Sequence, residues 1–197
     1  MLGINLNGVE SGGGYPMIEA GGYVIRITKA VNNTSKFRME FEFDIAEGDF
    51  KDHYAGFKER YGWNKATFNK YYTEKAIKFF KEFIETVEDS NGGAPGLVVQ
   101  VTDENGEPQE DIDETKFVGL QLGMVFGLEE YYSEKKGKVY TREDFYGAQF
   151  VTVDAIHNGD YSVPALKLLD KRPNTEASGV VDTTAGFEPV QDDDVPF

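Results

Sequence analysis

The sequence has no cysteine and only two histidines, His53 and His157, among its 197 residues. Disulfide bonds, thiolate metal sites and thiol nucleophiles are therefore excluded, and two histidines are too few to indicate a metal centre. No run approaches about 18 uncharged apolar residues, so we expect no membrane span. The opening MLGINLNGVESGGG has neither the basic nor the apolar part of a secretory signal. We therefore expect a cytoplasmic protein.

Common catalytic motifs are also missing. The sequence contains no Gly-x4-Gly-Lys-Ser/Thr phosphate loop, no Gly-x-Ser-x-Gly elbow and no His-Glu-x-x-His zinc motif. The acidic stretch 103–114, DENGEPQEDIDE, lacks the ligand order and the sixth-position glycine of a calcium loop, so we interpret it as a solvated loop. We expect neither an enzyme nor a bound cofactor or metal.

Negative charge dominates the chain but is unevenly distributed. The formal net charge is −15, yet residues 51–81 carry eight Lys or Arg against three Asp or Glu. Residues 101–115 hold seven acidic residues and residues 173–197 hold six, with no basic residue in either segment. Because a site responds to its local field, the basic block keeps nucleic acid among the candidate partners.

Alternating apolar residues predict β-strands on both sides of the basic block. In residues 37–45, FRMEFEFDI, every second side chain from Phe37 onward is apolar, which is typical of a half-buried strand. Residues 22–30 alternate similarly, and residues 139–156 supply the closing strands. Residues 118–131, VGLQLGMVFGLEEY, combine one apolar face with recurring glycines. Glycine inside a strand indicates strong curvature or the close approach of another backbone.

One helix is predicted between these groups of strands. Apolar residues recur at three- and four-residue steps over about 73–89, and the following SNGGAPG ends the pattern. Residues 50–62 have no clear period, and we interpret them as a third strand or an irregular arm. The stretch LVVQV predicts a further short strand. The apolar face of the helix contains Ala76, Phe79, Phe80, Phe83, Ile84 and Val87.

This order of elements predicts a mainly β protein with one major helix, an OB-fold-like five-stranded barrel. The helix of that fold lies between the third and fourth strands, and a glycine-rich, curved strand suits barrel closure. A generic α+β domain fits the same pattern. We expect a flexible segment at 1–20, the barrel at 21–170 and a disordered acidic tail at 171–197, where Pro, Gly, Ser, Thr and Asp leave little to bury.

The basic block interleaves cations with aromatic rings. Cations neutralise the phosphates of single-stranded nucleic acid, and rings stack on unpaired bases at about 1–3 kcal/mol per base. Alternatively, several of these rings only pack in the core, and the helix lysines form its solvated face. Cations on the outer faces of the first two strands would extend a basic track across the barrel. The predicted DNA-binding residues are Arg26, Lys29, Arg38, Tyr54, Lys58, Arg60, Tyr61, Trp63, Lys65, Lys70, Tyr71 and Tyr72.

The sequence ends in QDDDVPF. A disordered acidic tether gains too little by packing on its own domain to offset the entropy of ordering, but it can bind a partner. Its phenylalanine suits an apolar pocket lined by Arg or Lys, and its carboxylates suit a basic rim. A merely solubilising tail is the alternative. The predicted partner-binding residues are Asp192, Asp193, Asp194, Val195, Pro196 and Phe197.

This ending resembles that of bacterial single-stranded DNA-binding proteins, whose tails close with Asp-Asp-Asp-Ile/Leu-Pro-Phe; Val195 replaces Ile or Leu. Residues 21–89 and 147–170, including FEFDIAEGDFKDHY, KATFNKYYTEKAIKFFKEFIETVE and VDAIHNGDYSVPALKLL, resemble a family of phage and prophage proteins of Gram-positive bacteria. That family is encoded among replication and recombination genes and taken to bind single-stranded DNA. The resemblance implies an OB-like core, and the tip implies recruitment of helicases, nucleases, primases or recombination mediators. The acidic body, −9 over residues 1–172, departs from this pattern.

We therefore predict a non-enzymatic protein that binds single-stranded DNA without reading its sequence, acts in phage replication and recombination, and can form a homo-oligomer. One alternative is an adaptor or inhibitor that imitates the host protein's tail without binding DNA itself. Another is a recombinase that anneals complementary strands. Binding of oligo-dT by the domain separates the first prediction from the adaptor.

Overall fold

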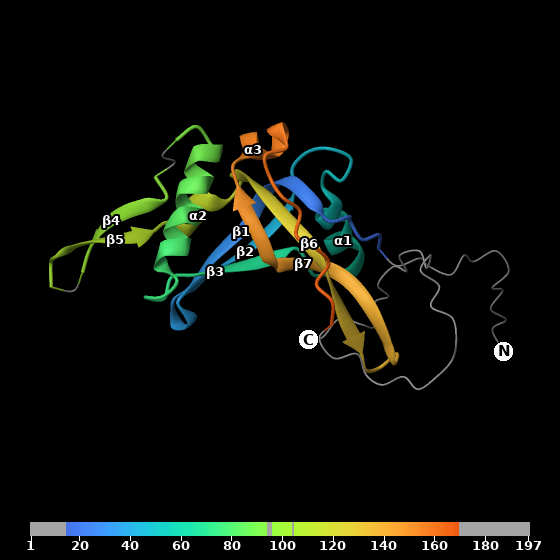
Figure 1. Cartoon of the computed structure of the whole chain (residues 1–197). Helices are drawn as coiled ribbons and strands as arrows, with labels where there is room; N and C mark the ends of the chain where they lie inside the picture. Colours follow the sequence, from blue (N-terminus) through green and yellow to red (C-terminus); the bar gives the residue numbers. More distant parts are fainter. Residues whose placement is uncertain (1–14, 94–95, 104, 170–197) are drawn as a thin grey trace, which may run out of the picture.

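The computed structural model describes residues 15–93, 96–103 and 105–169 (Figure 1). Five antiparallel strands form one sheet in the order β3-β2-β1-β6-β7. The two edge strands approach each other, since the rings of Phe68 on β3 and Phe150 on β7 have centroids 4.8 Å apart. The strands are β1 Gly21–Asn33, β2 Arg38–Ile45, β3 Thr67–Tyr71, β6 Gln121–Ser133 and β7 Lys138–Val151.

The sheet is thus a nearly closed five-stranded barrel, which confirms the predicted mainly β, OB-like fold. Helix α2, Ile77–Ser90, follows β3 and precedes β6, so it lies between the third and fourth barrel strands as expected. The helix begins four residues later than the period predicts, because a turn at Thr73 comes first: its carbonyl accepts from the amides of Ala76 and Ile77. The predicted disordered tail, 171–197, lies outside the described residues.

The core follows the alternation of the strands. On β2, Met39, Phe41, Phe43 and Ile45 are at most 1% exposed. From α2, the buried rings of Phe80 and Phe83 cover one end of the barrel, with Phe83 5.4 Å from Phe41 between ring centroids. Burial of such rings and aliphatic side chains is the main source of the stability of the fold.

Two predicted core residues are instead at the surface. Phe37 does not begin the β2 strand, because it ends the short 3-10 turn Thr34–Lys36 in a left-handed conformation with φ of 49°. Its ring is 58% exposed. Phe79 belongs to α2 but points away from the barrel and is also exposed. Both rings fit the apolar pattern of the sequence. Phe37 nevertheless lies in the turn before β2, and Phe79 lies on the solvent-facing side of α2.

Residues 50–62 form neither a strand nor an arm. They contain helix α1, His53–Tyr61, whose first turn is held by a residue of β2: Asp44 accepts hydrogen bonds from the amides of Tyr54 at 2.9 Å and Ala55 at 2.7 Å. Asp44 is buried, so these charge-assisted bonds replace its lost hydration. The third barrel strand is β3, which comes after this helix.

The acidic stretch after α2 also has regular structure. Strand β4, Val98–Thr102, pairs with β5, Pro108–Ile112, so the interpretation of 103–114 as a loop is wrong for the β5 residues. This hairpin lies beside α2 and extends away from the barrel (Figure 1). Residues 139–156 likewise differ from expectation, because they form the single long strand β7 followed by helix α3, Val153–Asn158.

The glycine of strand β6 at position 123 marks a close approach of backbone, as predicted. A Cβ atom there would lie 2.8 Å from the carbonyl oxygen of Thr152 and 2.6 Å from Cγ1 of Ile156. Both residues belong to the start of α3 and its cap. Glycine therefore lets α3 pack directly on the barrel wall.

Segments at both ends of the described chain pack on the barrel. Ile18 precedes residue 21, the predicted start of the domain, yet its side chain is buried. The Tyr15 hydroxyl donates a hydrogen bond to the carbonyl of His53 at 2.5 Å. After α3, Lys167 pairs with the edge of β6: its amide donates to the carbonyl of Leu128, and its carbonyl accepts from the amide of Glu130, both at 2.9 Å. The packed unit therefore begins before residue 21 and includes Lys167.

Candidate nucleic-acid interface

A groove of about 260 Å³ lies on the outer face of β1, β2 and β3. The same alternation that sends every second side chain of β2 into the core presents the intervening side chains here. Tyr146, on β7, borders the groove across the barrel seam. The residues that line the groove include Lys29, Arg38, Glu40, Glu42, Asn69 and Tyr146.

The predicted cations of this face are present but paired with carboxylates. Arg38 contacts Glu40 at 2.5 Å, and Arg26 contacts Asp52 at 2.9 Å. Glu42 receives two cations, with its carboxylate 3.2 Å from the ammonium nitrogen of Lys29 and 3.0 Å from that of Lys58. The face is therefore nearly charge-balanced rather than strongly basic.

These pairs hold the two central carboxylates in their ionised form. Hydrogen bonds from Arg38 and Asn33 lower the pKa of Glu40. Burial raises the pKa of Glu42, but hydrogen bonds from Lys58, Lys29 and Asn64 outweigh it, so the pKa lies below its ordinary value. A phosphate that binds this face must therefore compete with ionised carboxylates for the same cations.

Aromatic rings are exposed beside these ion pairs. Tyr146 is 75% exposed and Tyr71, at the end of β3, is 46% exposed. The Arg38 guanidinium carbon lies 5.9 Å from the centroid of the Tyr71 ring, and its Nη1 donates to the Tyr71 hydroxyl at 3.2 Å. Exposed rings held beside a cation can stack on unpaired bases.

A second group of predicted residues gathers at the end of α1. Trp63 is partly exposed and its ring meets that of Phe57 edge-on at 4.9 Å. The Arg60 guanidinium lies 5.3 Å from the centroid of the Tyr61 ring. Asn64 donates to Glu42 at 3.4 Å, which joins this group to the groove on β2. The end of α1 therefore adjoins the groove through the contact between Asn64 and Glu42.

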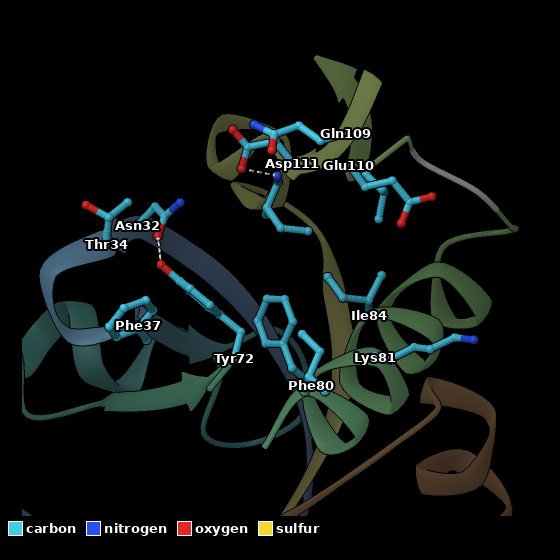
Figure 2. A pocket seen from close by; sticks show the side chains of 13 residues that line it. Asn32, Thr34, Phe37, Tyr72, Phe80, Lys81, Ile84, Gln109, Glu110 and Asp111 are labelled. Atoms are coloured by element: carbon cyan, nitrogen blue, oxygen red, sulfur yellow. Dashed lines mark hydrogen bonds between the residues drawn. The ribbon is translucent and has the colours of Figure 1, made fainter. Parts of the chain in front are cut away.

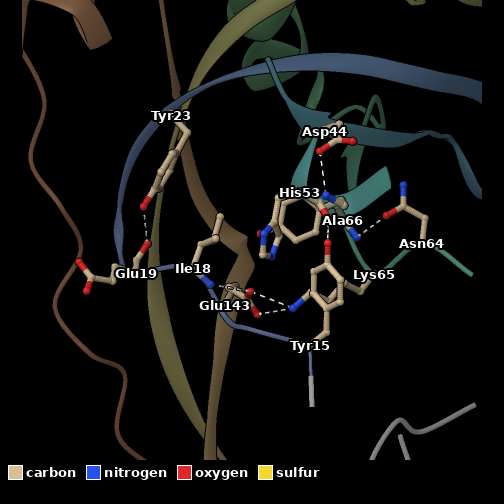
Figure 3. Close-up of polar contacts among 11 residues, drawn as sticks. Tyr15, Ile18, Glu19, Tyr23, Asp44, His53, Asn64, Lys65, Ala66 and Glu143 are labelled. Carbon is tan, nitrogen blue, oxygen red and sulfur yellow. Dashed lines mark hydrogen bonds and ion pairs between the residues drawn. The ribbon is translucent and has the colours of Figure 1, made fainter. Parts of the chain in front are cut away.

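Two predicted DNA-binding residues lie in the interior instead, and Figure 3 shows one of them, Lys65, beside Glu143. Tyr54 is fully buried, so its ring has no free face for a base. Lys65 points inward and pairs with the buried Glu143 of β7, its ammonium nitrogen 2.9 Å from Oε1 and 3.2 Å from Oε2. The aromatic-basic pattern in sequence does not distinguish this structural ion pair from a surface cation.

Lys70 and Tyr72 are also turned away from the groove. Lys70 shares the inward face of β3 with Phe68, and its ammonium lies 4.0 Å from the centroid of Phe150. Burial lowers the pKa of Lys70 from 10.5 to about 8. The Tyr72 hydroxyl donates to the side-chain oxygen of Asn32 at 2.6 Å, on a different surface of the molecule. We therefore leave these two, with Tyr54 and Lys65, out of the candidate interface.

The sequence reasoning missed Tyr146 and the exposed position of Phe37. Tyr146 belongs to a stretch interpreted only as closing strands, although it alternates with the buried Phe145 and therefore had to face outward. Phe37 is exposed because it adopts a left-handed conformation at the end of the turn before β2. The sequence NNTSK predicts a turn there, but it does not predict the direction of the Phe37 ring. Tyr146 borders the groove on the outer face of β1, β2 and β3, whereas Phe37 lies beside Tyr72 on a different surface.

The remaining predictions fall outside this face. The tip residues 192–197 lie outside the described residues. Within the described ranges, no cluster of three or more His, Asp or Glu side chains could hold a metal ion. Among the described helices, none has the length and apolarity needed to cross a membrane.

Comparisons with known proteins add no assignment. No protein-family model matches the chain, and no significant match was found among curated proteins or solved structures. The function must therefore be inferred from the fold and this face.

Proposed function

We propose that the protein binds single-stranded DNA on the outer face of β1, β2 and β3 without reading its sequence. OB-like barrels use this face and the adjoining loops for oligonucleotides. The observation that carries the proposal is a groove that contains Lys29, Arg38 and the exposed Tyr146, with the exposed Tyr71 hydrogen-bonded to Arg38. The rings supply stacking platforms and the cations supply phosphate contacts.

The second part of the proposal concerns the C-terminal tip. Its Asp-Asp-Asp-Val-Pro-Phe sequence would recruit replication or recombination enzymes to the coated strand, as its resemblance to bacterial single-stranded DNA-binding proteins implies. The acidic residues favour encounter with a basic partner surface, and Pro196 limits the entropy lost on docking. In this proposal, the protein acts beside phage replication enzymes.

A titration with labelled oligo-dT tests the DNA-binding part. We expect Tyr71→Ala with Tyr146→Ala to weaken binding by about 10- to 100-fold, the loss of one or two stacked bases. Phe79→Ala is the matched control, because it removes an exposed ring from α2 that does not line the groove. Wild-type affinity in the double variant would refute the proposed interface.

The adaptor or inhibitor is favoured by one specific observation. Carboxylates form ion pairs with all four cations of this face, which makes these cations less available to phosphates. The four are Arg26, Lys29, Arg38 and Lys58. That alternative predicts a full-length protein indifferent to oligo-dT even at about 50 mM salt, where electrostatic binding is strong. Accelerated pairing of complementary oligonucleotides would instead indicate a strand-annealing activity.

A further inference from the structure

A second, larger groove lies on another part of the surface (Figure 2). It has a volume of about 740 Å³ and runs between the β1–β2 turn, α2 and β5. Tyr72, Phe80 and Ile84 line its interior. Phe37 and Ile77, at its margin, are 58% and 51% exposed. Large apolar side chains exposed around a groove indicate a surface that another molecule covers.

One wall of this groove is an open strand edge. Four successive residues of β5, positions 109–112, line the groove, whereas β4 contributes Val98 alone. Within the described residues, β5 pairs only with β4. The Asp113 amide bonds to the carbonyl of Leu97, so by the alternation of antiparallel pairs Glu110 and Ile112 direct their backbone groups away from β4.

The backbone groups on this edge are suited to pairing with another strand. The Ile112 amide donates to the side chain of Asp111 at 2.8 Å, a local contact that an incoming strand can replace. Pro108 has no amide and sets one limit of the edge. An extended peptide pairing with residues 109–112 would lie over the apolar floor of the groove.

Charge selects the kind of peptide. Glu110 and Asp111 line the β5 wall, and Lys81, on the opposite wall, lies 3.7 Å from Glu85. Burial raises the pKa of the Tyr72 hydroxyl, and the negative charge of Asp111 raises it further. The carboxylate of Asp111 therefore acts on a side chain that lines the groove. The wall repels DNA and the acidic tip of this chain. It also opposes edge-to-edge pairing of two copies, which would bring identical carboxylates together.

We propose that this groove binds an extended segment of a partner protein that carries alternating apolar residues and Lys or Arg. The segment adds a strand to the free edge of β5. Its apolar side chains contact Phe80, Ile84 and Ile77, and its cations contact Glu110 and Asp111. This site is distinct from both the DNA interface and the C-terminal tip, so the protein has a second route to a partner.

The proposal is tested with full-length protein and three labelled peptides, followed by fluorescence anisotropy. The first is Lys-Val-Lys-Ile-Arg-Val-Lys-Phe, and the second replaces each basic residue with Glu. The third keeps the basic residues, Ile and Phe but replaces both valines with Pro to prevent strand pairing. We expect saturable binding of the first, and affinity lower by about tenfold or more for the other two. Amide shifts in NMR spectra should concentrate at Glu110 and Ile112.

Variants locate the binding and separate it from DNA binding. Ile77→Asp should abolish it, whereas Phe79→Asp, on the same helix but outside the groove, should retain it. Glu110→Lys with Asp111→Lys should transfer preference to the acidic peptide. Oligo-dT affinity should be unchanged in Ile77→Asp, so failure here is distinct from failure of the DNA interface.

Four results would overturn the proposal. The first is equal affinity for the basic and acidic peptides, and the second is wild-type affinity in Ile77→Asp. The third is displacement of the basic peptide by a peptide ending in Asp-Asp-Asp-Val-Pro-Phe, which would assign the groove to this chain's own tip. The fourth is dimerisation that Ile77→Asp abolishes, which would assign the groove to a second copy.

Discussion

At the scale of the residue, burial decides which cations of the basic block are structural. Lys58 and Lys65 are seven positions apart in the same aromatic-basic stretch. Lys58 stays exposed beside Glu42. Lys65 points into the interior because it forms an ion pair there with Glu143, which lies 78 residues further along the chain. The sequence could predict the composition of this stretch, whereas the direction of each side chain depends on distant residues.

The Lys65–Glu143 pair gives the first prediction. Lys65→Met should lower the free energy of unfolding by about 3–5 kcal/mol, because it leaves the buried carboxylate of Glu143 without its cation. Lys58→Met should cost about 1 kcal/mol or less, since its pair with Glu42 is exposed. Urea unfolding at pH 7 measures both, and equal costs would contradict the structural role of Lys65.

Lys70 gives a prediction on pH. Its pKa is about 8 in the folded protein and 10.5 ordinarily, so the unfolded chain binds the proton more tightly. Protonation of Lys70 therefore opposes folding below pH 8, and this opposition is lost as the pH rises from 8 to 10.5. Lys70→Met should raise the free energy of unfolding at pH 7, by an amount that shrinks toward pH 9.5. Urea unfolding at pH 7, 8 and 9.5 measures the difference, which a pH-independent value would contradict.

At the scale of the element, strong periods in the sequence are confirmed and long-range supports are missed. The two-residue period of β2 and the three- and four-residue steps of α2 each bury one face, so both could be predicted from local pattern. Helix α1 could not, because its first turn depends on Asp44 of another element. The short strand predicted at LVVQV is confirmed as β4, whereas β5 is exposed at every position except Ile112 and so lacks an alternating apolar pattern.

The candidate interface shows the same division. Arg26 and Arg38 could be placed on the outer faces of β1 and β2 because period-two alternation fixes their direction. Lys29 has the parity of the buried Ile27, and it faces outward because a β-bulge between Ile27 and Lys29 shifts the register. Tyr146 could not be placed beside them, since this requires barrel closure between β3 and β7. Pairwise ion contacts such as Arg26 with Asp52 also depend on the turn that leads into α1.

The contact between β6 and α3 gives a prediction for an element. Gly123→Ala should lower the free energy of unfolding by about 1–3 kcal/mol, because the added methyl group overlaps the Thr152 carbonyl and forces α3 away from the barrel. Gly106→Ala on the β4–β5 turn is unsuitable as a control, because its φ is 87°. Ala155→Gly in α3 provides the comparison, as it loosens the same helix without overlap. A Gly123→Ala protein as stable as wild type would contradict the close packing.

At the scale of the whole molecule, charge governs how DNA binding should respond to conditions. The net charge of −15 opposes a polyanion, and the cations of the interface must first leave their carboxylates. Because each phosphate contact releases condensed counterions, affinity should fall steeply with salt, with a slope of about −0.7 per phosphate neutralised. Trp63, at the border of the interface, should lose fluorescence when oligo-dT binds.

Deleting residues 173–197 removes six acidic residues and no basic ones, so affinity for oligo-dT should stay equal or rise. The measurement is a titration of oligo-dT with the full-length and the shortened chain at about 50–300 mM salt, where counterion release dominates binding. Replacing Asp192, Asp193 and Asp194 by Asn in the full-length chain is the control for charge without loss of length. A marked fall in affinity on deletion would show that the tail contributes to binding.

The pairing of Lys167 with β6 determines where the chain can be cut safely. Its two backbone bonds cover part of the β6 edge at Leu128 and Glu130. A chain truncated before Lys167 would leave those groups open as a template for neighbouring molecules, and such edges promote aggregation. Poor solubility of a protein truncated before Lys167 would then reflect the unpaired edge of β6 rather than the loss of the acidic C-terminal residues.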